Sequence, residues 1–149
     1  AAQARIARVL EQAIQGDLHE PAIEALERQG DVHQLRQETQ RATAAYERAL
    51  AVIAQSGINA ARASIAGKLA ALYLDANQVV EAESLLGYLI EQEPSAQTLT
   101  VRAQHAAITG DHAAALELMG KAKALAGASW TADDQLSLER YATAAGPAQ

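Results

Sequence analysis

The sequence predicts an all-α protein, and three observations support this fold class. The chain is 50% hydrophobic yet only 3% aromatic, with no Phe, and much of its apolar content is Ala. Alanine is the strongest helix former, and only 3 Pro residues are available to interrupt helices. No segment alternates β-branched and polar residues over the length of a strand. Small aliphatic side chains also let helices approach one another closely.

Length, charge and cysteine content limit the class of protein. The 149 residues suit one domain with a core of its own. The formal net charge of −6 argues against a nucleic-acid-binding surface, which usually carries a basic stripe. The sequence has no Cys, and its apolar runs are far shorter than the ~18–20 residues that span a bilayer. No signal-peptide pattern opens the chain. We therefore expect no membrane insertion and a cytoplasmic location, with the periplasm as an alternative.

The N-terminal residues 1–20 are predicted to contain an amphipathic helix over residues 2–15. Its apolar residues recur at helical spacing: Ile6, Val9, Leu10, Ala13 and Ile14. Gly16 is expected to end this helix, and Asp17 can cap the next one. Pro21 suits the first turn of that second helix, where its missing N–H does no harm.

An internal repeat follows. Three segments share an apolar stripe that opens with Ala and places a large residue four positions on. They are Ala42, Ala45, Tyr46, Ala49 and Leu50; Ala82, Leu85, Leu86, Leu89 and Ile90; and Ala115, Leu118, Met119 and Ala122, with Leu125 close behind. The opening Ala residues are 40 and then 33 positions apart. We expect Leu86 at the centre of the core.

Each stripe is preceded by another helical segment and a turn. Gly110 can end one helix in the left-handed conformation, and Asp111 can cap the next. The second turn is Asp75-Ala76-Asn77, whereas the first has Gln37-Glu38 in place of a Gly-Asp pair. Gly and Pro also separate the helix pairs from one another, at Gly57 and at Pro94.

The segments Tyr46-Glu47-Arg48-Ala49-Leu50 and Gly110-Asp111-His112-Ala113-Ala114-Ala115 resemble the second-helix and turn signatures of tetratricopeptide repeats. Small residues that the family conserves correspond here to Gly30, Ala42 and Ala49; Ala70 and Ala82; and Ala103, Ala115 and Ala122. The sequence departs from the family at Leu89, which replaces a small residue, and lacks the tryptophan early in each first helix. The resemblance covers about residues 22–127. It implies three antiparallel helix pairs in a right-handed superhelix, forming one domain over residues 1–149.

The tail is predicted to form a capping helix over residues 131–145. Thr131 and Asp134 have the spacing of a capping box, in which each side chain accepts from a free backbone N–H. Leu136, Leu138 and Tyr141 give this helix a partly apolar face. Such a helix would cover the last pair, which otherwise leaves an open hydrophobic face.

No pattern predicts catalysis, a cofactor or a metal. The four histidines, His19, His33, His105 and His112, lack the spacing of helical zinc ligands, so we expect them on the polar surface. The alternative is that His105 and His112, beside Asp111, form a weak metal site on the surface.

Two further patterns have structural explanations. Asp133 and Asp134 would point about 100° apart on a helix, which suits a first helical turn better than acid–base work. Gly120-Lys121 lacks the upstream Gly and the following Ser or Thr of a phosphate-binding loop. We therefore predict that the chain is not an enzyme.

In tetratricopeptide arrays the first helix of each pair lines a concave groove that holds a peptide. The resemblance implies these groove residues: Glu24, Glu27, Asp31, Gln34, Ser64, Lys68, Ala71, Gln97, Thr100 and Gln104. Glu27 and Asp31 stand where chaperone-binding members of the family hold a terminal carboxylate with Lys, Asn and Arg, so that ligand is not expected. An acidic groove end would suit a basic or amphipathic peptide. The alternative is that these positions are simply solvated.

The predicted function is therefore protein–protein interaction. We expect a scaffold module that binds a peptide or a partner helix, within a larger regulatory or assembly protein. Gly30-Asp31-Val32-His33 and the helix that contains Tyr46 look similar to repeats in large bacterial signal-transduction ATPases and transcriptional activators. The alternative is a structural role, in which open helical faces serve as contacts in a homo-oligomer.

Overall fold

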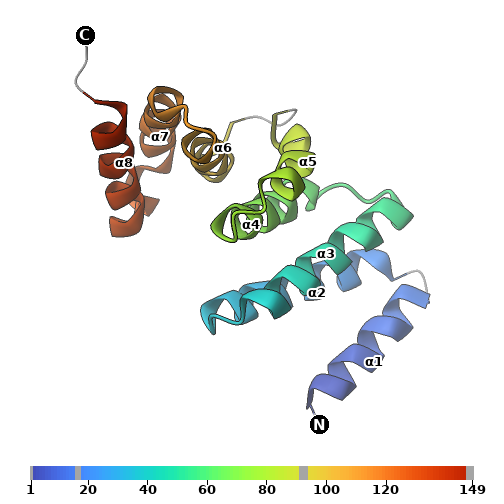
Figure 1. Cartoon of the computed structure of the whole chain (residues 1–149). Helices are drawn as coiled ribbons and strands as arrows, with labels where there is room; N and C mark the ends of the chain where they lie inside the picture. Colours follow the sequence, from blue (N-terminus) through green and yellow to red (C-terminus); the bar gives the residue numbers. More distant parts are fainter. Residues whose placement is uncertain (1, 16–17, 91–93, 147–149) are drawn as a thin grey trace. The chain divides into compact units, whose positions relative to one another are not determined.

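The computed structural model describes residues 2–15, 18–90 and 94–146, apart from the side chains of residues 13, 14 and 90 (Figure 1). Within these residues every regular element is a helix, which confirms the predicted all-α class. The elements are α1 (Ala2–Gln15), α2 (His19–Leu35), α3 (Thr39–Ser56), α4 (Arg62–Asp75), α5 (Val79–Ile90), α6 (Ala96–Ile108), α7 (His112–Ala126), the 3₁₀ turn η1 (Gly127–Ser129) and α8 (Ala132–Ala145).

The chain divides into two compact units, residues 1–72 and residues 73–149. The boundary falls inside α4, between Leu72 and Tyr73, and not in a loop. Unit 1 contains α1 to α3 and most of α4. Unit 2 contains the last turn of α4 and helices α5 to α8.

Three turns between helices share one backbone geometry. Gln37, Asn77 and Gly110 have positive φ angles of 60°, 59° and 95°. Each of these residues donates its N–H to the carbonyl three residues back, at 2.9, 3.0 and 3.1 Å respectively. The next residue donates to the carbonyl five residues back, at 2.8, 2.7 and 2.8 Å. This is the Schellman motif that commonly ends helices. The α2–α3, α4–α5 and α6–α7 connections are therefore the same turn, although only the third contains Gly.

In unit 1, α2 and α3 pack side by side (Figure 1). Ala42, Ala45, Tyr46 and Ala49 of the first predicted stripe are buried, whereas Leu50 is half-buried. They share the core with Ile23 and Leu26 of α2, and with Val52 and Ile53 further along α3. Along α4, the buried residues of this unit include Ile65, Ala66, Leu69 and Ala70.

Helix α1 forms as predicted, but its apolar stripe does not enter the core as a whole. Leu10 is buried, while Ile6 and Val9 are 47% and 58% exposed. The remaining stripe residues, Ala13 and Ile14, and the expected helix end at Gly16 and Asp17 lie outside the described residues or side chains. The following helix begins at His19 with Leu18 as its N-cap, and Pro21 lies in its first turn.

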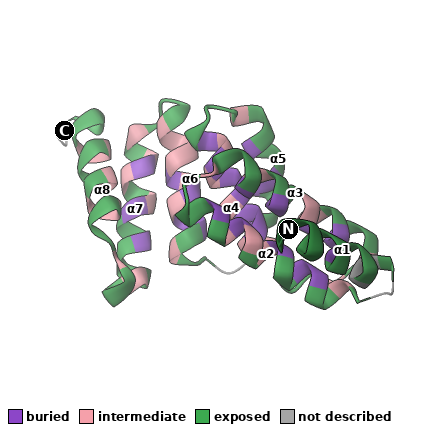
Figure 2. Ribbon diagram, turned by 90° about the horizontal axis from the view of Figure 1, so that it is seen from below, coloured by how far each residue is buried: buried purple, intermediate pink, exposed green. Residues whose placement is uncertain are grey.

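In unit 2, α6 packs on α7, and α7 packs on α8. Ala103, Ala115 and Met119 form a buried cluster against which Leu118, Trp130, Leu138 and Tyr141 pack. Figure 2 shows buried residues along α7 but only intermediate and exposed residues on α8. The second stripe is buried at Ala82, Leu85, Leu86 and Leu89. Leu125 was expected to continue the apolar stripe of α7, and Leu136 to belong to the apolar face of α8. Both are instead mainly in solvent, at 56% and 57% exposed.

Side-chain caps begin α6, α7 and α8. Thr131 and Asp134 form the predicted capping box of α8, with hydrogen bonds of 3.0 and 3.1 Å. Asp111 accepts the N–H of Ala114 at 3.0 Å, as predicted for α7. A second capping box, formed by Ser95 and Thr98, begins α6 and was not predicted from the sequence.

Candidate binding surfaces on the first helices of the pairs

Four of the predicted groove residues meet at one point in unit 1. Lys68 of α4 places its Nζ 2.9 Å from Glu27 Oε1 and 3.0 Å from Asp31 Oδ1, both on α2. Ser64 donates its hydroxyl to the same Glu27 oxygen at 2.9 Å. The Lys68 and Glu27 side chains are only 24% and 19% exposed, whereas the Asp31 side chain is 42% exposed, so the network is partly buried.

Tyr46 of α3 completes the network. Its hydroxyl donates to Asp31 Oδ1 at 2.6 Å and lies 3.1 Å from Gln34 Oε1. Burial, the hydrogen bond to Asp31 and the charges of Asp31 and Glu27 raise the pKa of Tyr46 above its ordinary range. Burial lowers the pKa of Lys68, but the hydrogen bonds and charges of Glu27 and Asp31 outweigh it and raise that pKa. The network therefore joins a protonated phenol and an ammonium to two carboxylates.

This arrangement corrects the expectation of an acidic groove end in the first repeat. Glu27 and Asp31 share Lys68, and Glu24 pairs with Arg28 at 2.5 Å. Residues 1–72 contain eight acidic and eight basic side chains and have no formal net charge. Residues 73–149 contain ten acidic and four basic side chains, which gives −6. The acidic character of the chain lies in unit 2.

In unit 2, two predicted groove residues line an open pocket of about 470 Å³. Thr100 and Gln104 come from α6, and their neighbours come from the end of α4 and from α8. The complete lining is Leu74, Asp75, Thr100, Gln104, Ala107, Ile108, Ser137, Arg140 and Tyr141. The prediction treated α8 only as a cap, yet three of its residues line this pocket. Ser137, Arg140 and Tyr141 recur at the i, i+3, i+4 spacing that places side chains on one helix face, the sequence signal that could have identified them.

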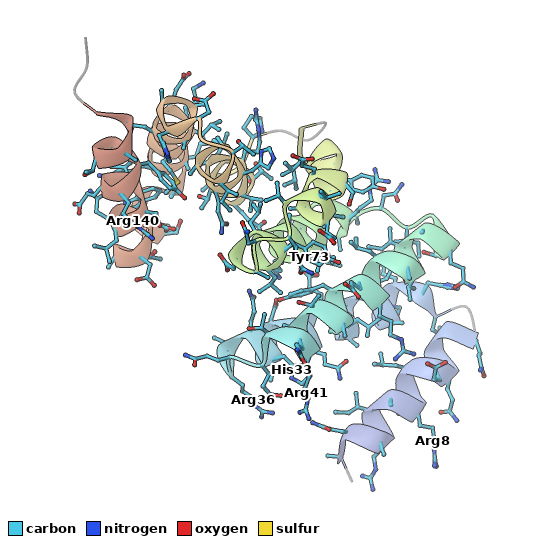
Figure 3. All side chains as sticks on the ribbon, viewed as in Figure 1. Arg8, His33, Arg36, Arg41, Tyr73 and Arg140 are labelled. Carbon is cyan, nitrogen blue, oxygen red and sulfur yellow. The ribbon has the colours of Figure 1, made fainter. Side chains whose placement is uncertain are left out.

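The polar groups of the pocket are partly paired among themselves. Gln104 Nε2 donates to Asp75 Oδ1 at 2.5 Å, and Thr100 donates its hydroxyl to the Ala96 carbonyl at 2.7 Å. Arg140, labelled on α8 in Figure 3, donates to Ser137 Oγ at 3.3 Å. Burial raises the pKa of Tyr141, Arg140 lowers it and Asp75 raises it, with a net rise. Both charges therefore act on the same phenol.

The other predicted groove residues lie outside this pocket. Gln97 is exposed at the start of α6, and Ala71 is half-buried on α4 in unit 1. Gln34 is exposed beside the Tyr46 hydroxyl. The structure thus brings the predicted residues together in two places, one in each unit, and a single groove that contains both stays a prediction.

The histidines lie deeper than the expected surface positions, because His33 is buried and His19, His105 and His112 are half-buried. His33 is buried, and its Nδ1 lies 3.3 Å from Glu38 Oε2. Arg41 approaches the same carboxylate at 2.9 Å, so His33 of α2 and Arg41 of α3 meet at one group (Figure 3). His105 Nε2 lies 3.0 Å from Glu83, a carboxylate on α5. In the part of the chain that the structure describes, no group of three His, Cys, Asp or Glu side chains could hold a metal ion.

Compared with known proteins, the chain matches no family model, no curated protein and no solved structure. The resemblance to tetratricopeptide repeats therefore stays a prediction that depends on residue positions. Among the described helices, none has both the length and the apolar character that crossing a membrane requires.

Proposed function

We propose that the chain is a protein–protein interaction module that binds a peptide or a partner helix and has no enzymatic activity of its own. The observation that carries this proposal is the open pocket on α6 and α8, because it contains Thr100 and Gln104 from the predicted groove. Its volume of about 470 Å³ is in the range of pockets that bind small ligands or a few residues of a peptide. It combines apolar side chains with a few polar groups, as such sites usually do.

We further propose that the three helix pairs form a tetratricopeptide-like array within a larger regulatory or assembly protein. The three Schellman turns at Gln37, Asn77 and Gly110 support this, because they repeat one connection between first and second helices. In this right-handed superhelix α2, α4 and α6 would line the concave groove, and α8 would cover the last pair. The partner would be an amphipathic segment with basic residues, since unit 2 carries a formal charge of −6.

A photo-crosslinking experiment tests the proposed surface. A crosslinking amino acid at Gln104, in the pocket, is expected to capture a partner from the source cell. The same amino acid at Lys121, exposed on α7, serves as the matched position and is expected to capture little. Raising the ionic strength from about 50 to 500 mM is expected to reduce the yield at Gln104, because salt screens charge attraction. Equal yields at both positions, or capture from Lys121 alone, would contradict the groove assignment.

A structural self-association role is the second candidate, and the exposed Ile6 and Val9 on α1 favour it. Homo-oligomers favour symmetric contacts in which the same patch meets itself. Under the interaction-module proposal, sedimentation at micromolar concentration is expected to find mostly monomer. Self-association would be favoured instead by a dimer that persists on dilution to nanomolar concentration and that dissociates in the double variant Ile6→Ser, Val9→Ser.

A further inference from the structure

The pocket in unit 2 is lined by two opposite charges that do not neutralise each other. Arg140 of α8 and Asp75 at the end of α4 both line it, and both act on the Tyr141 phenol. Within the described residues Arg140 forms no ion pair, with Asp75 or with any other carboxylate. The pocket is therefore dipolar before any ligand arrives.

The Arg140 side chain has most of its hydrogen-bonding capacity free. Within the described residues its one hydrogen bond is a long one of 3.3 Å to Ser137 Oγ, whereas a guanidinium carries five N–H donors. A carboxylate can accept two parallel hydrogen bonds from this planar fork. Arg140 is also exposed, so a ligand can reach it without moving the helix.

Asp75 offers the complementary charge. Gln104 donates to Oδ1, and a carboxylate has two oxygens with about four acceptor positions in all. The acidic excess of unit 2 adds to the attraction of a cation, because its other charges have the same sign as Asp75. A purely acidic ligand would be repelled by this field, and a purely basic one would leave Arg140 unpaired.

The apolar side chains of the pocket specify the rest of the ligand. Ala107 and Ile108 line the pocket from α6, and Ile108 is 38% exposed. Leu74 adds a buried aliphatic side chain, and Tyr141 adds a half-buried ring. An apolar ligand side chain can therefore be covered while its charged neighbours stay at the rim.

We propose that this pocket selects an amphipathic peptide segment with an acidic and a basic side chain close together, the acidic one pairing with Arg140 and the basic one with Asp75. The inference rests on the proposed function and names the partner chemistry of the same surface. Residues of α8 thereby determine specificity and do more than cover the last helix pair.

Labelled synthetic peptides test this pairing. The set consists of acetylated, amidated, leucine-containing heptapeptides with one Glu and one Lys, spaced one to four residues apart. Matched peptides replace Glu with Gln, or Lys with Met. Binding to the full chain is measured by fluorescence anisotropy at low ionic strength. We expect the best Glu–Lys peptide to bind about tenfold more tightly than either matched peptide.

The variants assign the two charges. Arg140→Gln is expected to weaken binding of the Glu–Lys peptide by about tenfold and to change binding of the Gln peptide little, as a double-mutant cycle requires for a direct pair. Lys121→Gln removes the same charge elsewhere in unit 2 and is the control. Asp75→Asn is expected to weaken binding of the Glu–Lys peptide but not binding of the Met peptide. Glu117→Gln is its control. Circular dichroism checks that each variant stays folded.

Several results would overturn this inference. They are equal binding of the Glu–Lys and Gln peptides, full binding by Arg140→Gln, and no binding by any peptide of the set. The proposed function fails separately. If the chain captures a partner through Gln104 and Arg140→Gln captures it equally well, the interaction module stands and the dipolar pocket does not. If no partner is captured through Gln104, the proposed function itself is wrong.

Discussion

Gly30 and Tyr46 lie so close together that no side chain fits at residue 30 without displacing the ring. A Cβ added to Gly30 would lie 2.7 Å from Cδ1 and 2.8 Å from Cζ of Tyr46. The missing side chain lets the ring pack fully buried against α2. The same approach directs the Tyr46 hydroxyl to Asp31, the residue next to the glycine.

Gly30→Ala is therefore expected to destabilise the chain by about 1–3 kcal/mol, as overpacked core substitutions usually do. Denaturant unfolding followed by circular dichroism measures the change. Gly87→Ala and Gly120→Ala are the controls, because both glycines lie inside helices with open space around an added Cβ. Each is expected to stabilise by about 0.5–1 kcal/mol. A Gly30→Ala variant as stable as these two would show that Tyr46 does not pack as described.

The raised pKa values of Tyr46 and Lys68 predict a loss of stability in alkaline solution. The unfolded chain releases the Tyr46 proton near the ordinary value of 10, whereas the folded chain retains it to higher pH. The contribution of Tyr46 is thus complete below about pH 10 and is lost as the pH rises through the folded pKa. The contribution of Lys68 to stability depends on pH in the same direction, because the pKa of Lys68 in the folded chain also lies above its ordinary value of 10.5.

Tyr46→Phe is expected to reduce this alkaline dependence, by at most about 1.4 kcal/mol per pH unit. It is also expected to cost about 0.5–1.5 kcal/mol at neutral pH, because a hydrogen bond is lost. Unfolding free energies measured between pH 7 and 11 give both quantities. Tyr88→Phe, at a partly exposed ring on α5, is the control. An unchanged slope in Tyr46→Phe would place the alkaline response elsewhere.

Lys68→Met is expected to cost about 1–3 kcal/mol, since it removes the cation shared by Glu27 and Asp31. The two carboxylates would then repel each other in a partly buried site. Lys121→Met breaks an exposed pair with Glu117 and is expected to cost less than about 0.5 kcal/mol. Thermal unfolding of both variants at low salt compares them. Similar losses would mean that the Lys68 network is no stronger than a surface pair.

Deleting residues 131–149 is expected to promote association. The deletion removes Leu138 and Tyr141 from the cluster around Met119, and removes the Gln135 that accepts the Trp130 indole N–H at 3.0 Å. The uncovered apolar surface would then be a contact site. Light scattering compares the shortened chain with one that ends at Gly146. A truncated chain that stays monodisperse would show that α8 does not protect this face.

The helices and their ends could largely be predicted, because the signals are local. Apolar spacing indicates a helix over a few turns, and Thr131, Asp134 and Asp111 cap the residues nearest to them. The Gln37 turn could not be recognised in this way. Its left-handed conformation usually favours Gly, and here the surrounding helix pair imposes it on Gln.

The candidate sites could be predicted only in part. Placing Glu27, Asp31 and Lys68 on first helices was possible. However, Lys68 is separated from Asp31 by 37 positions and from Glu27 by 41, and no local sequence pattern indicates a salt bridge over such a distance. The sequence consequently suggested free carboxylates where the structure has paired ones. In the same way, the spacing of Ser137, Arg140 and Tyr141 shows that they share a helix face without showing which neighbour this face meets.

The continuity of α4 determines how the protein can be dissected. A fragment that begins at Tyr73 would keep the carbonyls of Tyr73 and Leu74, which accept the N–H groups of Gln78 and Asn77, but would lose the helix that holds them in place. A fragment that ends at Leu72 would leave the final carbonyls of the shortened helix without their donors. Separate expression of the two halves therefore needs overlapping pieces that both include Arg62–Asp75.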